Sequence, residues 1–61
     1  MQQIIGYYKN WLLVELNGFY YVVRRKERVL CKGSEEFATK VFVMLIDGFI
    51  TDDEAIRMRE T

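Results

Sequence analysis

The chain contains no histidine and only one cysteine, Cys31, among its 61 residues. A single cysteine excludes an internal disulfide, and one thiol without histidine excludes a zinc site of ordinary composition. The missing histidine also removes the usual general base that activates a cysteine nucleophile. We therefore predict a protein that is not an enzyme, binds no cofactor and no metal, and keeps Cys31 as a small buried apolar side chain.

Long apolar runs and phosphate-binding loops are missing as well. No stretch of 18 apolar residues is present to span a membrane, and no Gly-rich nucleotide loop is found. The start of the chain lacks the positive region and apolar stretch of a secretory signal. Together with the lone cysteine, these absences predict a cytoplasmic protein with no membrane partner.

The size of the chain favours self-association. Residues 1–61 are enough for a single small domain, and 51% of them are hydrophobic. A domain of this length buries only about 60% of the surface of its unfolded chain, so it usually needs a disulfide, a metal or oligomerisation. The first two are excluded, and we therefore expect a homo-oligomer, with a homodimer as the simplest form.

The strongest local signal is the dipeptide Asn17-Gly18 between two β-rich runs, 11–16 and 19–25. This dipeptide suits the two positive φ angles of a type I′ turn, so the runs form a hairpin with a two-residue loop. The resulting register places Leu16 opposite Phe19, Val14 opposite Tyr21, and Leu12 opposite Val23. Because these six side chains share one wholly apolar face, we predict that this face packs on the core.

The opposite face of the hairpin is mixed. It carries Trp11, Leu13, Glu15, Tyr20, Val22 and Arg24. A free sheet face is normally polar, so this face is expected to be covered by the N-terminal segment or by a second copy of the chain. The prediction for a protein interface is the aromatic-rich patch of Trp11, Leu13, Tyr20 and Val22.

The rest of the sheet is less well defined by the sequence. Residues 2–8 read as β-structure with a bulge or close approach at Gly6, either as a separate strand or as an extension of the next. A charged turn at 25–28 precedes a short strand over 29–32. A three-residue turn places Val29 and Cys31 on the core face, whereas a two-residue turn places Leu30 there. We favour Val29 and Cys31.

Two helices with clear caps follow. Ser34 is a good N-cap for a helix over about 35–47, which stops at Gly48 and is apolar around more than half of its circumference. Thr51 and Glu54 form a capping box that begins a last short helix, about 52–60. The predicted fold is α+β: a three- or four-stranded antiparallel β-meander packed by one long α-helix, followed by a short C-terminal helix.

The segment between the helices resembles two known patterns. It resembles the second half of an EF-hand loop, with Asp47 and Glu54 at ligand positions. The preceding ligand positions hold Val43 and Leu45, which have no side-chain oxygen, so calcium binding is not expected. It is also similar to a pattern of two short helices, L-x-x-G-x-I-T-x-x-E, found at the ends of many bacterial and phage proteins. The matching residues are Leu45, Gly48, Ile50, Thr51 and Glu54, and the similarity implies geometry alone.

Charge is divided unevenly along a neutral chain. Residues 1–34 hold six Lys/Arg and two Glu, a balance of +4, and residues 35–61 hold three Lys/Arg and seven Asp/Glu, a balance of −4. The possible nucleic-acid contacts are Arg24, Arg25, Lys26, Arg28 and Lys32, with Tyr7, Tyr8, Trp11 and Tyr20 as candidate stacking surfaces. A domain that depends on phosphate contacts is usually basic overall, which this chain is not.

These observations predict a small regulatory or protein–protein interaction protein that acts as a homodimer. Small proteins of this build are common among phage and mobile-element products, and some bind host proteins. The alternative is a nucleic-acid-binding protein that uses the basic hairpin tip 24–28.

Overall fold

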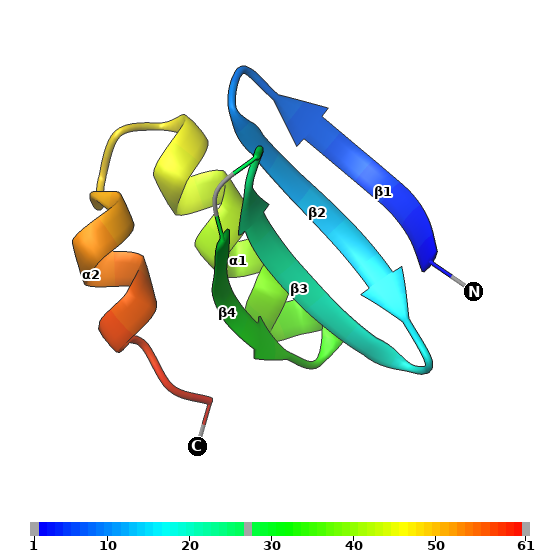
Figure 1. The fold of residues 1–61 in the computed structure, drawn as a ribbon. Coiled ribbons are helices and arrows are strands. Elements are labelled where there is room, and N and C mark those ends of the chain that lie inside the picture. The colour runs from blue at the N-terminus through cyan, green and yellow to red at the C-terminus, as the bar shows by residue number, and fades with distance from the viewer. Residues whose placement is uncertain (1, 27, 61) are drawn as a thin grey trace.

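The computed structural model describes residues 2–26 and 28–60, which form a four-stranded antiparallel sheet and two helices (Figure 1). The elements are β1 (Gln2–Tyr8), β2 (Trp11–Leu16), β3 (Phe19–Arg24), β4 (Arg28–Gly33), α1 (Glu35–Ile46) and α2 (Asp52–Arg57). The strands lie in the sheet in chain order. The predicted α+β meander is therefore confirmed in its four-stranded form, with β1 as a separate strand. Glu27, part of the expected charged turn, lies outside the described residues.

The β2–β3 hairpin has the predicted register. Asn17 and Gly18 adopt φ angles of 55° and 87°, as a two-residue turn of this kind requires. Leu16 pairs with Phe19, and the pairing continues in step to Trp11 and Arg24. The Glu15 carboxylate accepts a hydrogen bond from the Gly18 N–H at 2.9 Å and so supports the turn.

The predicted choice of core face is wrong. Helix α1 lies on one face of the sheet (Figure 1), and the face it covers carries Leu13 and Val22, which are 4% and 0% exposed. The six-residue apolar face that was assigned to the core is the opposite one. Alternation divides the side chains between two faces, but it does not say which face a distant helix will cover. The covered face tolerates Glu15 and Arg24 because both lie at its ends, where they meet a turn and α2.

Strand β4 contains a bulge that the sequence did not indicate. Arg24 pairs with Arg28, which agrees with a three-residue turn, but Val23 pairs with Val29 while Val22 pairs with Cys31. Leu30 is the extra residue, and both Leu30 and Cys31 are buried. Cys31 is therefore buried as predicted, whereas Val29 is 53% exposed on the face without a helix, contrary to prediction.

Strand β1 is an edge strand with its own irregularity. Its register with β2 shifts between Ile4 and Gly6, which confirms the bulge expected near Gly6. A Cβ placed on Gly6 would lie 3.7 Å from the Phe42 ring of α1, so this part of β1 reaches the edge of the helix. Ile4 pairs with Val14 and Tyr7 pairs with Leu12, which places Ile4 and Tyr7 on the face without a helix.

The helix caps follow the sequence closely. The Ser34 hydroxyl accepts a hydrogen bond from the Phe37 N–H, and α1 ends one residue before the expected limit, ahead of Gly48 with φ of 79°. Both hydrogen bonds of the Thr51–Glu54 capping box are present. Helix α2 ends at Arg57, earlier than predicted, and the chain returns so that the Glu60 carboxylate accepts hydrogen bonds from the Ser34 N–H and hydroxyl. No helix among the described residues is long and apolar enough to cross a membrane.

Candidate protein interface

The main candidate site is the sheet face that no helix covers. We call it the open sheet face and define it by the cross-strand pairing, which places nine apolar or aromatic side chains together. They are Ile4, Tyr7, Leu12, Val14, Leu16, Phe19, Tyr21, Val23 and Val29. Contiguous apolar patches of this kind on small proteins usually mark an interaction surface.

The relief of the open sheet face is uneven. Val14, near its centre, is only 5% exposed although no helix covers it, because its neighbours on the sheet surround it. A shallow hollow of about 320 Å³ lies beside it, lined by Gln2, Val14, Leu16, Tyr21, Val23 and Val29. Tyr7 and Phe19 are 70% and 52% exposed on the same face. The face therefore presents both a depression and aromatic side chains able to enter one.

Polar groups lie at the edge of this face. Lys32 pairs with Tyr21, and its ammonium group sits 5.1 Å from the centre of the Phe19 ring. Such a cation–π contact lets the lysine stem lie against the apolar surface while the charge stays in water. An apolar centre with a polar rim is the usual arrangement of a protein–protein interface.

The interface residues proposed from the sequence lie on the other side of the sheet. Leu13 and Val22 belong to the hydrophobic core, and Trp11 and Tyr20 are partly buried against it. These four residues do come together, but they do so beneath the helices. They therefore contribute to the packed side of the sheet and do not form an exposed patch.

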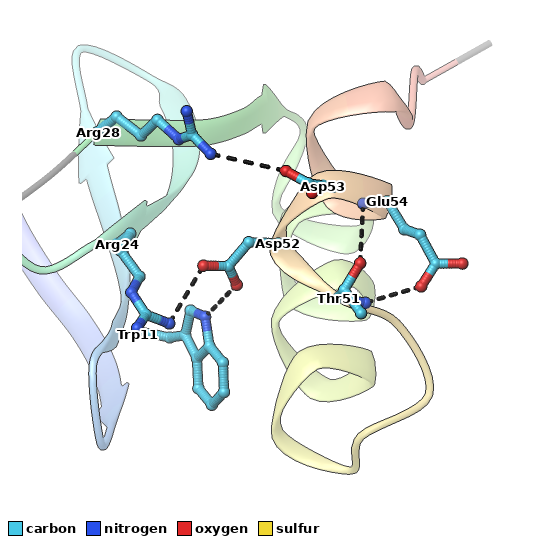
Figure 2. Close-up of polar contacts among 7 residues, drawn as sticks. All are labelled: Trp11, Arg24, Arg28, Thr51, Asp52, Asp53 and Glu54. Atoms are coloured by element: carbon cyan, nitrogen blue, oxygen red, sulfur yellow. Dashed lines mark hydrogen bonds and ion pairs between the residues drawn. The ribbon is translucent and has the colours of Figure 1, made fainter.

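Asp52, at the start of α2, ties this helix to the covered side of the sheet. One carboxylate oxygen accepts a hydrogen bond from the Trp11 indole N–H at 2.9 Å, and the other lies 3.1 Å from the Arg24 guanidinium (Figure 2). The guanidinium also lies 5.6 Å from the centre of the Trp11 ring. Helix α2 is thus held by a three-residue polar cluster whose members are far apart in the sequence.

The acidic end of α2 also faces two of the basic residues predicted as nucleic-acid contacts. Besides the Asp52–Arg24 pair, Asp53 lies 3.8 Å from Arg28, with both side chains largely exposed (Figure 2). Arg25 and Lys26 remain at the exposed β3–β4 turn. Lys32 lies at the other end of β4, so the five predicted cations do not form one patch.

The structure adds Lys9 to the basic end of the sheet. The Arg25 N–H donates a 2.7 Å hydrogen bond to the Asn10 carbonyl, which brings the β1–β2 and β3–β4 turns together. The Lys9 ammonium lies 5.4 Å from the centre of the Tyr8 ring. Of the candidate stacking residues, Tyr7 belongs to the open sheet face, while Trp11 and Tyr20 pack against the core.

Burial raises the pKa of the Cys31 thiol above its ordinary value of 9.0, against a smaller opposing effect of a hydrogen bond with the Val22 backbone. Above pH 9 the unfolded chain loses this proton while the folded chain keeps it. We therefore expect ionisation of the Cys31 thiol to have no effect on the free energy of unfolding below pH 9. It should then fall as the pH rises toward the folded-state pKa, with a slope of at most about 1.4 kcal/mol per pH unit.

Urea unfolding between pH 7 and pH 10.5 measures this effect, and Cys31→Ala is the control because it leaves every other titrating group in place. The wild-type chain should lose more stability with pH than the variant does. Parallel curves for the two proteins would contradict a raised thiol pKa.

Comparison with protein-family models, with curated proteins and with solved structures found no match. Within residues 2–26 and 28–60, no group of three or more His, Cys, Asp or Glu side chains is arranged to hold a metal ion.

Proposed function

We propose that this chain is a small non-enzymatic protein that binds another protein through its open sheet face. The observation that carries the proposal is the nine-residue apolar face left uncovered by both helices. Burying such a face on association gains the same hydrophobic free energy that drives core formation.

The composition of the face favours a protein partner over a nucleic acid. Six of its nine members are aliphatic, and aliphatic side chains offer no ring on which a base can stack. The cations at the basic end are partly balanced by Asp52 and Asp53. A surface that follows a phosphate backbone needs a continuous row of available cations.

The reactive residue types have structural roles, which supports a non-catalytic function. Cys31 is buried and its thiol pKa is raised, so little nucleophilic thiolate forms near neutral pH. Asp52 binds Trp11 and Arg24, and Glu54 completes a helix cap. A buried free thiol also suits a reducing compartment, and we propose that the protein acts in the cytoplasm.

Photo-crosslinking tests the proposal directly. A benzophenone amino acid placed at Phe19 samples the open sheet face, and the same group placed at Phe49 samples an exposed aromatic position in the loop between the helices. We expect protein adducts from position 19 at several times the yield from position 49. Equal yields, or adducts from position 49 alone, would overturn the proposal.

The alternative function is nucleic-acid binding at the basic end, favoured by the hydrogen bond between Arg25 and Asn10 that joins the turns carrying Lys9 and Lys26. Titration of fluorescently labelled single- and double-stranded DNA at low and moderate salt tests it. A protein-binding role predicts no salt-dependent binding in the micromolar range. Binding that weakens with salt and disappears on Arg25→Glu and Lys26→Glu would establish the alternative.

A further inference from the structure

We infer that the occupant of the open sheet face is a second copy of this chain, joined in a symmetric two-sheet sandwich. This inference rests on the proposed function and specifies its partner. In such a dimer each sheet keeps α1 on its outer side, and the two open faces pack on one another about 10 Å apart.

The charge distribution allows a face of this kind to meet itself. A two-fold axis brings identical patches together, so any charge near the centre of the patch would face a like charge. The nine residues of the open sheet face carry no charged side chain, and Lys32 lies at the edge on β4. The whole chain has a net charge of zero, which removes long-range repulsion between copies.

The area of the open sheet face is sufficient for a dimer of moderate affinity. Four strands spaced about 4.8 Å apart and about six residues long, at about 3.3 Å per residue, give a footprint of roughly 20 by 20 Å. Allowing for surface relief, two copies bury on the order of 1,000 Å² in total. Each copy then contributes about a tenth of its 4392 Å² surface. This lies at the lower limit for specific interfaces, so we expect a micromolar dissociation constant.

The open sheet face carries both a hollow and exposed aromatic side chains able to fill the hollow of a second copy. The 320 Å³ depression is lined mainly by aliphatic side chains and Tyr21, while Phe19 and Tyr7 stand exposed on the same face. A facing copy rotated by the usual angle between packed sheets can place an aromatic side chain over the hollow. Both parts of the contact are present in one chain, as an isologous interface requires.

Edge pairing through β1 is the competing way to join two copies, and the bulge opposes it. Strand β1 has no charged side chain, but its ladder is interrupted between Ile4 and Gly6. Bulges of this kind twist an edge strand and hinder further pairing. The other edge, β4, carries Arg28 and Lys32 and has α2 packed beside it. Face packing is therefore favoured over edge pairing.

Sedimentation equilibrium of the full chain, from about one to several hundred micromolar, tests the inference over the expected range. We expect a monomer–dimer equilibrium in the wild-type protein. Phe19→Lys and Val29→Lys each place a charge at an exposed position of the face, so each should raise the dissociation constant at least tenfold with an unchanged circular dichroism spectrum. Phe49→Lys, at an exposed position away from the sheet, is the matched control and should leave the equilibrium unchanged.

The outcomes separate this inference from the proposed function. A wild-type chain that stays monomeric over the whole range would overturn the second-copy assignment. Crosslinks from position 19 to a different protein would then leave the proposed function intact. A dimer that is insensitive to Phe19→Lys and Val29→Lys, or that is lost on Phe49→Lys, would also overturn the inference. Absence of any adduct from position 19 would overturn both.

Discussion

Leu13→Ala is expected to destabilise the folded chain by about 2–4 kcal/mol, the usual range for a leucine removed from a packed core. Leu13 is buried among the residues beneath α1, so truncation leaves a cavity. A chain of 61 residues has a total stability of only about 3–9 kcal/mol. The variant should therefore lose a large share of the chain's total stability. Urea unfolding followed by Trp11 fluorescence measures the loss.

Leu12→Ala is the matched control, because it removes the same atoms from the neighbouring residue of the same strand. Leu12 pairs with Val23 on the open sheet face and is partly exposed. We expect its truncation to cost less than about 1 kcal/mol of folding free energy when measured at a protein concentration where the chain is monomeric. A larger loss of folding free energy for Leu12→Ala than for Leu13→Ala would show that the core lies on the face that the sequence favours.

This pair of variants tests which face of the hairpin packs on the core, where the prediction from the sequence differs from the structure. The Asn17-Gly18 turn determines which residues lie opposite each other, because a two-residue loop allows one register. Leu16 pairs with Phe19 in the structure for that reason. Which face becomes the core depends on where α1 docks, and that contact joins segments distant in the chain. The sequence favours the more uniformly apolar face, yet α1 covers the mixed one.

The helix starts could be predicted because their signals are local, whereas α2 ends three residues before the predicted limit. Ser34 and Thr51 each act within three residues, as an N-cap or capping box does. The bulge at Leu30 gave no such signal, since either Leu30 or Cys31 alone fits a regular strand. It lets β4 bury both side chains while Val29 stays on the open sheet face.

The sequence predicts only part of the candidate site, the open sheet face. Hairpin alternation groups six members of the open sheet face correctly, but it predicts that they pack on the core. Ile4 and Tyr7 join them through pairing of β1 with β2, which depended on whether residues 2–8 formed a separate strand. The alternation of Ile4 with its neighbours was the available signal, but the bulge before Gly6 breaks its period.

Asp52→Ala is expected to destabilise the chain by about 1–3 kcal/mol and to loosen α2. The substitution removes one carboxylate that accepts from the Trp11 indole and pairs with Arg24, at 2.9 and 3.1 Å. These partners lie 41 and 28 positions away in the chain, so the carboxylate joins α2 to the sheet. Hydrogen bonds to a charged, partly buried group contribute more than exposed ion pairs do. Urea unfolding and hydrogen exchange of the α2 amides measure the two effects.

Asp53→Ala separates this contact from the general effect of an acid at a helix start. Asp52 and Asp53 are both in the first turn of α2, so each loses a similar interaction with the helix dipole. Asp53, however, only approaches Arg28 at 3.8 Å, and both side chains are largely exposed. We expect its truncation to cost no more than about 0.5–1 kcal/mol. Equal losses for the two variants would show that the dipole, not the Trp11–Arg24 contact, holds α2. A red shift of Trp11 emission in Asp52→Ala alone would place the difference at the indole.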